Sequence, residues 1–446
     1  MVKRYSTKSM AFVVAAILVL TLVLSGCGGS NTPNNSEAAS GGDGGNTPAA
    51  AAEKSKVTLW YLWGGAEGEV LEGLIKKFNE SQDKYVVEGL SVPDEQKVKI
   101  AIAGGNGPDL TDSFASNVAQ YAEEGIALEL DSLIERDKYE LTDFIPASLE
   151  QGKYNGKFYA LPMNTTVQGL FYNKKLLAEA GYTEPPKTSK ELYDMAVKMT
   201  KKNANGTLDV LGFPSYPNFS FQALAYGFGG EYVSKDGEQV LFNSDANLAA
   251  LQSIYDYNKE FGVDSIKRIQ ASGKWLDPTD PFMTGKQAFR IDGPWLSTFM
   301  KNNNITLDYG LAPLPYLDGH PELAGSGENQ SSIFYIAKNS KNTDGAWEFM
   351  KFLFSAPELA EFTAGLGNIP ANVKAMEDHR FKEIQDADAF IALSKSGNVK
   401  SLPNIPALND ILNKVVKEEA EAVANLKKTP EEGLASMQSR TEALIK

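Results

Sequence analysis

The sequence predicts an α/β protein in which parallel strands are covered by helices, in a chain long enough for two lobes. Strand and helix periodicities alternate from residue 57 onward, in the order that parallel sheets require. The chain has 446 residues, of which 42% are hydrophobic and 22% charged, as is ordinary for a folded soluble protein. This length exceeds one ordinary hydrophobic core and fits two units of typical domain size.

The first five predicted elements establish a β-α-β-α-β order. Residues 57–63 alternate but are apolar on both faces, as in a buried parallel strand. Apolar residues at helical spacing follow over 70–78, and a second strand is predicted over 85–90. A short helix over 98–103 and a third strand that begins at 108–110 continue the pattern. A parallel sheet with helices on its faces is therefore expected.

Later segments add strands, a polar interruption and helix starts. Residues 158–162 and 167–172 have strand character, and the polar residues Asn164, Thr165 and Thr166 lie between them. Capping boxes, in which Ser or Thr is followed three residues later by Glu, predict three helix starts, at Thr188–Glu191, Ser355–Glu358 and Thr429–Glu432.

The N-terminus has the features of an export signal. Three bases precede an apolar run from Met10 to Leu24, which is short for a membrane span of about 20 apolar residues. The stretch Leu24-Ser25-Gly26-Cys27 follows, and Cys27 is the only cysteine. It resembles the bacterial lipobox, which implies cleavage after residue 26 and a diacylglycerol anchor on the Cys27 thiol. The alternative is a plain secretory signal with a cysteine near its cleavage site.

Composition limits what the exported chain can bind. The whole chain has a net charge of −14, and removal of the three leader bases would leave −17. Such acidity argues against nucleic acid and against electrostatic binding to anionic lipid, so the anchor would be the membrane contact. Only two histidines, His320 and His379, are present and far apart, so neither a metal site nor a cofactor is expected. Residues 28–55 have the composition of a flexible linker.

Several short motifs occur in a fixed order along the mature chain. They include Gly107-Pro108-Asp109-Leu110, Phe171-Tyr172-Asn173-Lys174, Pro185-Pro186-Lys187-Thr188, Phe282-Met283-Thr284-Gly285-Lys286, Ile291-Asp292-Gly293-Pro294-Trp295 and Pro403-Asn404-Ile405-Pro406. In combination they resemble the extracellular solute-binding proteins of carbohydrate-uptake ABC importers, the group that includes maltodextrin-binding protein. The resemblance covers essentially the whole mature chain.

The resemblance implies a two-lobe, type II periplasmic-binding-protein fold with a hinge of crossing strands and a ligand cleft between the lobes. The leader would be 1–26 and the lipidated cysteine with its linker 27–55. The first lobe would be 56–164 plus 334–378, and the second 165–333 plus 379–446. The implied function is a monomeric receptor on the outer face of the cell membrane. It would capture a sugar or oligosaccharide and deliver it to an ABC permease without chemistry on the ligand.

A sugar site needs aromatic platforms beside hydrogen-bonding side chains. In the first lobe and at the crossover, strand ends and the resemblance indicate Trp63, Glu67, Asp112, Ser113, Ser116, Asn117, Asn164 and Thr166. Trp63 could instead be a core residue, and Asn164 and Thr166 could belong to a satisfied hinge network. The maltodextrin group has a Trp near Ser113 and an Asp near Ser116, so the ligand or its pose is expected to differ.

In the second lobe the resemblance indicates Tyr216, Asn218, Phe219, Asp292, Trp295 and Asn329. Trp295 is the leading candidate, because the family stacks this Trp on its ligand. Its alternative is packing under the following helix. A second stacking Trp of the maltodextrin group is replaced here by a residue near Leu412.

Other classes of function remain open at this point. An exported glycoside hydrolase would need two carboxylates about 5–9.5 Å apart, for which Glu67 and Asp292 are conceivable. The chain has no GxSxG, HExxH or GxxxxGK[ST] motif. The same fold could bind an amino acid, polyamine, phosphate ester or metal chelate, or could signal to a membrane kinase.

Overall fold

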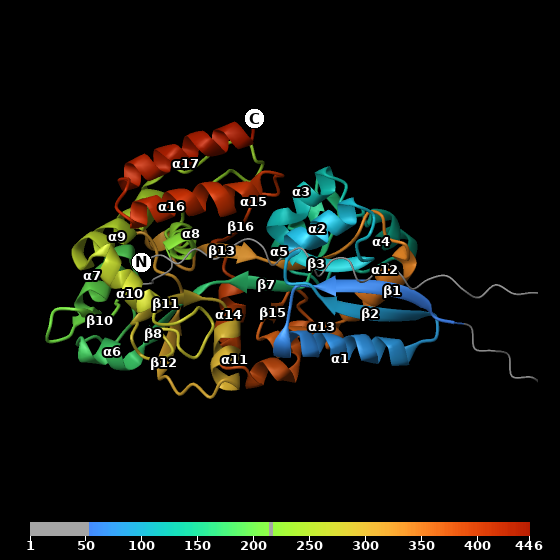
Figure 1. Ribbon diagram of the computed structural model, residues 1–446, viewed down its shortest axis with the longest axis horizontal. Helices are drawn as coiled ribbons and strands as arrows, with labels where there is room; N and C mark the ends of the chain where they lie inside the picture. Colours follow the sequence, from blue (N-terminus) through green and yellow to red (C-terminus); the bar gives the residue numbers. More distant parts are fainter. Residues whose placement is uncertain (1–52, 214–216) are drawn as a thin grey trace, which may run out of the picture. The chain divides into compact units, whose positions relative to one another are not determined.

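The computed structural model describes residues 53–213 and 217–446 (Figure 1). The leader, Cys27, most of the predicted linker and Tyr216 lie outside the described residues, and the predictions made for them stay predictions.

The first sheet has five strands in the order β2-β1-β3-β14-β6. Strand β1 pairs in parallel with β2 and β3, which confirms the predicted order of the first three strands. Strand β14 comes from a distant part of the chain and pairs antiparallel with β3 and β6. The bounds are β1 (Ser55–Tyr61), β2 (Tyr85–Ser91), β3 (Leu110–Phe114), β6 (Leu161–Pro162) and β14 (Ser332–Ile336).

Helices cover the faces of this sheet because each has one apolar stripe. Helix α1 buries Leu71, Leu74, Ile75 and Phe78, and α12 buries Trp347 completely. The helices are α1 (Gly65–Ser81), α2 (Glu95–Ala103), α3 (Val118–Glu123), α4 (Asp131–Asp137), α5 (Pro146–Glu150), α12 (Thr343–Leu353) and α13 (Ala356–Leu366). Short elements complete this part: η1 (Ala115–Asn117), β4 (Lys153–Tyr154), β5 (Lys157–Phe158), η3 (Ala375–Glu377) and η4 (His379–Glu383).

The second sheet is antiparallel, with the order β11-β8-β12. Its strands are β8 (Gly169–Asn173), β11 (Phe289–Asp292) and β12 (Tyr309–Ala312), and a separate pair is β9 (Lys201–Lys202) with β10 (Leu208–Val210). Its helices are α6 (Lys174–Glu179), α7 (Ser189–Met199), α8 (Pro217–Gly227), α9 (Asp245–Phe261), α10 (Val263–Gln270), α11 (Trp295–Asn302), η2 (Pro321–Leu323) and α14 (Ala387–Ser394). Near the C-terminus α15 (Leu408–Asp410), a π-helical turn (Ile411–Val416) and α16 (Lys417–Ala424) follow one another, and α17 (Pro430–Leu444) ends the chain.

A third sheet, β15-β7-β13-β16, links the other two. Strand β7 (Asn164–Val167) follows β6 of the first sheet and leads into β8 of the second. Strand β13 (Gly327–Gln330) leads back into β14 of the first sheet. Strands β15 (Ile369–Pro370) and β16 (Val399–Ser401) pair with β7 and β13. The chain therefore crosses between the two larger sheets through paired strands, which can act as a hinge.

Three local expectations need correction. Strand β1 ends at Tyr61, so Trp63 lies in the turn beyond it. Thr188 and Thr429 form the predicted capping boxes, but the Ser355 hydroxyl donates to the Glu358 carboxylate and caps no backbone amide. The polar residues from Asn164 onward do not interrupt strands. They form strand β7, because β13 and β15 supply its backbone partners.

The apolar residues gather in separate cores. One core lies within residues 170–437 and a second within 57–390. The second core also takes in Phe171, Phe282 and Leu296, which the predicted boundaries place in the other lobe. The exact lobe boundaries therefore stay a prediction.

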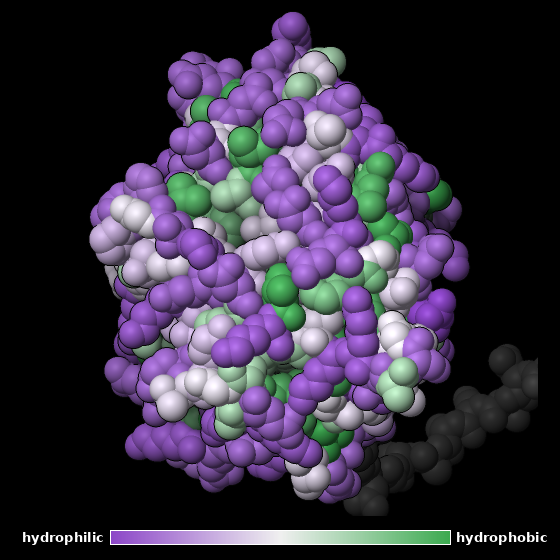
Figure 2. All heavy atoms as spheres, turned by 90° about the vertical axis from the view of Figure 1, so that its left-hand side faces the viewer, coloured by the Kyte–Doolittle hydropathy of each residue, from purple (hydrophilic) through white to green (hydrophobic). Residues whose placement is uncertain are grey.

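The surface is mainly hydrophilic, as the charge suggested. Figure 2 shows the face at the left of Figure 1, where apolar residues appear only as small separated patches. Among the described residues, no helix has the length and hydrophobicity needed to cross a membrane.

Candidate functional site

Trp63 follows β1 and belongs to an aromatic cluster of the first lobe. Its ring stacks on Phe334 with centroids 5.8 Å apart and meets Phe362 edge to face at 5.2 Å. Both partners are fully buried, and Trp63 itself is half-buried. This packing favours the core role over the role of a free platform.

Glu67 lies in the first turn of α1, near the carboxyl end of β1. Its side chain reaches solvent, yet the surrounding protein partly excludes water from the carboxylate and raises its pKa.

The carboxyl end of β3 carries a buried polar network. Ser113 and Asn117 are buried, the Ser113 hydroxyl and the Asn117 amide both donate to Glu95 of α2, and Asn117 Nδ2 lies 2.8 Å from Glu95 Oε1. The Asp112 carboxylate, 3% exposed, accepts from the Leu62 backbone amide at 2.9 Å. Burial raises the pKa of Asp112 well above its ordinary value. These side chains are engaged within the lobe, and only Ser116 remains half-buried.

The crossing strands bind one another rather than leaving their side chains free. The Asn164 Oδ1 atom accepts from the Ser332 amide at 2.6 Å, and Asn329 Oδ1 accepts from the Thr166 amide at 3.1 Å. Asn329 also donates to the Ser148 hydroxyl at 3.1 Å. The predicted contacts Asn164, Thr166 and Asn329 are thus buried members of a satisfied hinge network.

Asp292, which the sequence predicted as a ligand contact, ends β11 in a buried ion cluster. The Arg290 guanidinium lies 2.6 Å from Asp292 Oδ2 and 2.7 Å from Asp280 Oδ2, and none of the three side chains is more than 2% exposed. Asp292 Oδ1 accepts from the Gly293 amide at 2.8 Å. The carboxylate therefore fixes the turn that leads into α11 and faces no solvent.

Trp295 begins α11 directly after that turn. Its ring folds back over Gly293, where any Cβ atom would collide with it. The ring is half-buried, and within the described residues its buried Nε1 atom has no hydrogen-bond partner. A Cβ on Gly367, in the turn between α13 and β15, would lie 3.1 Å from Trp295 Cα. Trp295 thus lies where the turn after α13 meets the start of α11, with a donor left unused.

The remaining predicted contacts are placed only by their backbone. Asn218 and Phe219 lie in the first turn of α8, and Tyr216 lies outside the described residues. Their roles as ligand contacts stay predictions.

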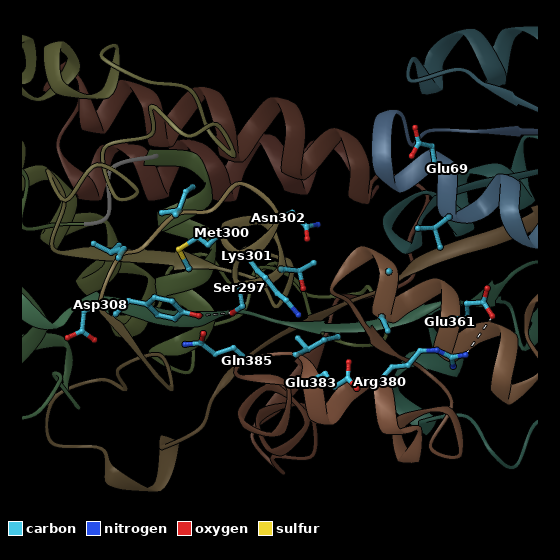
Figure 3. Close-up of a pocket in the computed structure, with 18 of the residues that line it drawn as sticks. Glu69, Ser297, Met300, Lys301, Asn302, Asp308, Glu361, Arg380, Glu383 and Gln385 are labelled. Carbon is cyan, nitrogen blue, oxygen red and sulfur yellow. Dashed lines mark hydrogen bonds and ion pairs between the residues drawn. The ribbon is translucent and has the colours of Figure 1, made fainter.

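A cavity opens between α1 and α13 on one side and α11 on the other (Figure 3). Its volume is about 1020 Å³, within reach of the size of small-molecule sites. Lys301 of α11 is one of the residues that line the cavity (Figure 3). Arg380 forms an ion pair with Glu361, with 3.7 Å between Nη2 and Oε2. The Tyr309 hydroxyl oxygen lies 2.7 Å from Asp386 Oδ2 and 3.1 Å from Ser297 Oγ along one wall.

None of the predicted ligand residues lines this cavity, although Ser297 and Thr298 continue the helix that Trp295 begins. Its walls carry both signs of charge, from Lys174, Lys301 and Arg380 and from Glu69, Asp308, Glu361 and Glu383. The described residues contain no cluster of three or more metal-ligating side chains. The arrangement suits reversible polar binding.

Two features escaped the sequence reasoning. Phe114, at the end of β3, is 51% exposed and borders a small hollow with Ser116, Gln330 and Leu402. Glu328 of β13 is a buried carboxylate bonded to the side-chain amides of Gln222 and Gln330. A signal for the first was present: an aromatic residue stands alone among the polar residues of 111–117.

Solved structures show the same fold. The structure titled "CpMnBP1 with Mannotriose Bound" superposes with a TM-score of 0.77 at 26% identity, covering 87% of this chain and 100% of that one. The sugar-binding protein MalE from Xanthomonas citri gives a TM-score of 0.71 at 21% identity, with 88% and 97% covered. The expected two-lobe, type II periplasmic-binding-protein fold is therefore confirmed.

Sequence comparison gives the same relationship. The maltotriose-binding protein of Pyrococcus abyssi (strain GE5 / Orsay) is 27% identical over 400 residues, which are 86% of this chain and 83% of the relative. The model of the bacterial extracellular solute-binding proteins matches residues 73–390. This match covers more than half of the chain, so the protein belongs to the family of bacterial extracellular solute-binding proteins.

Proposed function

We propose that the protein captures a sugar or oligosaccharide between its two lobes, outside the cytoplasm, and delivers it to an ABC importer permease. The observation that carries the proposal is Trp295. Its half-buried ring and unused Nε1 donor lie where the Gly367 turn of the first lobe meets α11 of the second. An aromatic face with an adjacent donor suits the C–H face and the oxygens of a sugar ring.

Kinship supports the choice of ligand. The relative from Pyrococcus abyssi, aligned over 86% of this chain, is named for maltotriose binding. A structural neighbour that covers 87% of this chain is solved with mannotriose bound. The paired crossing strands β7 and β13 supply a hinge for closure around such a ligand. A ligand that contacts both lobes binds the closed form more tightly and shifts the population toward it. No bond of the ligand is made or broken in this role.

The membrane part of the proposal rests on the N-terminal sequence. Cleavage before Cys27 and its lipidation would hold the protein at the outer face of the membrane, where two acyl chains anchor more firmly than one. Radiolabelled palmitate should enter the wild-type protein and not a Cys27→Ser variant. Retention of label in that variant would refute the anchor.

The ligand proposal is tested by melting curves of the mature protein recorded during titration with maltotriose and mannotriose. At about a hundred times its dissociation constant, a ligand should stabilise the protein by about 2.7 kcal/mol, a visible shift in melting temperature. Trp295→Ala should remove the shift, whereas Trp275→Ala, which alters a 47% exposed Trp, should keep it.

A phosphorylated glycerol is the second candidate. The sn-glycerol-3-phosphate-binding periplasmic protein UgpB of Brucella melitensis is 23% identical over 88% of this chain and 93% of its own. Titration with sn-glycerol 3-phosphate therefore belongs in the same experiment. Binding of that compound with silence from a wider saccharide panel would overturn the sugar proposal and keep the receptor.

A further inference from the structure

Glu328 is a buried carboxylate that has no cationic partner among the described residues. It lies on β13 and is 5% exposed. Lys400 of β16 is its neighbour in the strand ladder. The Lys400 ammonium, however, contacts Glu231 Oε1 at 2.7 Å and the Gly229 carbonyl at 3.0 Å. The recorded partners of Glu328 are therefore neutral amides.

Two glutamine side chains supply those amides. Gln222 of α8 donates from Nε2 to both Glu328 oxygens, at 2.9 and 2.7 Å. Gln330 lies two residues along β13, on the same face of the strand, and also donates from Nε2 to Glu328 Oε1. An ionised carboxylate can only accept hydrogen bonds, so it holds both amides with their NH2 groups inward. Their carbonyl oxygens become the outward ends, and in the described part of the chain no recorded donor bonds to either.

One of the two glutamines, Gln330, lies beside an exposed aromatic ring. Gln330 borders the same small hollow as Phe114, which is 51% exposed at the end of β3. Gln222 is half-buried and comes one helical turn after position 218 on α8. The first lobe thus contributes an apolar face, and α8 and β13 contribute two acceptors of fixed orientation.

We propose that the carbonyl oxygens of Gln222 and Gln330 form an acceptor pair for two neighbouring hydroxyls of a sugar ring. Phe114 is the adjoining apolar platform, and Glu328 is the positioning residue. The inference rests on the proposed function and deepens it by naming the ligand chemistry, a ring with a vicinal diol. Both amide nitrogens bond the same Glu328 oxygen, so the two side chains are close enough to serve adjacent ring carbons.

The charge of Glu328 gives this arrangement a pH signature. Burial raises the pKa of Glu328 to about 7. A protonated carboxyl group can donate to an amide carbonyl, which releases the orientation of both glutamines. The other groups nearby are Tyr226 and Tyr232, whose raised pKa values keep them neutral, and the Lys400–Glu231 pair. Ligand affinity should therefore fall as the pH drops below about 7.

The test is calorimetric titration of the full mature chain with maltotriose and mannotriose at pH 6 and pH 8. Gln222→Ala and Gln330→Ala should each weaken binding roughly tenfold at pH 8. Glu328→Gln should weaken binding at pH 8 and abolish its pH dependence, a readout that a purely structural role would not move. The matched control is Gln120→Ala, whose exposed amide donates to Glu124 at 2.8 Å and which should stay within twofold.

The outcomes separate this inference from the proposed function. Sugar binding that stays within twofold in both glutamine variants overturns the acceptor pair and leaves the sugar receptor standing. A pH dependence that persists in Glu328→Gln overturns the positioning role. If no saccharide of the panel binds the wild type, the proposed function fails and the acceptor pair fails with it. Melting curves of each variant show that a loss of affinity is not a loss of fold.

Discussion

Two buried carboxylate sites of the second lobe are stabilised in opposite ways. Asp292 and Asp280 flank Arg290, with ionic contacts of 2.6 and 2.7 Å. Although burial opposes its charge, the two carboxylates raise the pKa of Arg290. Glu328 has the same degree of burial but only amide partners, and its pKa rises to about 7. In the first site a guanidinium offsets part of the effect of burial, which still raises the pKa of Asp292, whereas the second site has no cation and can change its charge near neutral pH.

This difference separates a structural site from a responsive one. A buried carboxylate that contacts a guanidinium can hold its backbone, as Asp292 does for the Gly293 turn, even though burial raises its pKa. A buried carboxylate met only by neutral donors is costly when ionised, and in proteins such groups gather at functional sites. Asp292, in the structural site, lies three residues before Trp295, and Glu328, the responsive site, lies in the crossing strand β13. Both sites can therefore influence the proposed binding of a sugar.

The largest expected effect comes from breaking the paired site. Arg290→Gln would leave two buried carboxylates without their cation, which should lower the free energy of unfolding by about 3–5 kcal/mol. Urea denaturation at pH 7 measures this change. The control Arg136→Gln breaks surface pairs with Asp344 and Asp137 and should cost less than about 1 kcal/mol. Equal losses in the two variants would show that burial does not distinguish them.

The next effect concerns the unpaired site and its dependence on pH. The folded-state pKa of Glu328 is about 7, above its ordinary value of 4.5. Between pH 4.5 and pH 7 the folded protein therefore keeps a proton on Glu328 that the unfolded chain has lost. This stabilising contribution is complete below about pH 4.5 and is lost as the pH rises through 7. The loss should amount to about 3 kcal/mol for a shift of this size.

Denaturation between pH 5 and pH 8 tests that prediction. In wild type the Glu328 contribution should decline over this range, and in Glu328→Gln it should be absent. The difference between the two curves isolates the group from the many other carboxylates of the chain. Parallel curves would contradict the raised pKa of Glu328.

A smaller effect tests whether the paired site positions Trp295. Gly293→Ala places a methyl group against the Trp295 ring, and overpacking of this kind costs about 1–3 kcal/mol. The displaced ring should also weaken sugar binding, measured by calorimetry. A matched substitution is Gly73→Ala in α1, where a Cβ atom meets nothing within 4 Å and helix propensity favours alanine. Unchanged affinity in Gly293→Ala would separate Trp295 from the ligand.

The sequence predicted those features of the fold that depend on residues close together in the chain. The strand and helix order from 57 to 110 follows from local periodicity, and the Thr188 and Thr429 caps need only residues three positions away. The role of Asn164 could not be predicted in this way, because its hydrogen bond comes from Ser332, far along the chain. Polar residues there indicated an interruption, and the distant strands β13 and β15 made them a hinge strand.

The site shows the same limit. Asp292 was indicated by the family motif that ends in Trp295, but its partner Arg290 also contacts Asp280, which only the fold brings there. Phe114, which is 51% exposed, was missed although it stands alone among polar residues, because an apolar residue at a strand end usually belongs to the core. Glu328 was missed because its significance lies in the absence of a nearby cation, which depends on where Lys400 points.

The smallest expected effect concerns Asp112, a buried carboxylate of the first lobe that extends the comparison between Asp292 and Glu328. The buried Asp112 accepts from the Leu62 amide at 2.9 Å, and burial raises its pKa well above the ordinary value. Asp112→Asn keeps an acceptor oxygen and removes a charge that the site disfavours, so it should change the free energy of unfolding by less than about 1 kcal/mol at pH 5. At pH 8 the variant should be the more stable protein, because wild type must then ionise Asp112 or hold its proton.

Asp109, three residues earlier, is the matched control. Burial there is outweighed by hydrogen bonds that lower its pKa: Oδ1 accepts from the Ser340 hydroxyl at 2.8 Å and from two backbone amides, and Oδ2 accepts from Thr58 at 2.8 Å. An amide at this position would turn an NH2 group toward donors, so Asp109→Asn should destabilise the protein by about 1–3 kcal/mol at either pH. If both variants lose the same stability, the number of donors does not decide which buried carboxylate is structural, and the contrast between Asp292 and Glu328 loses its basis.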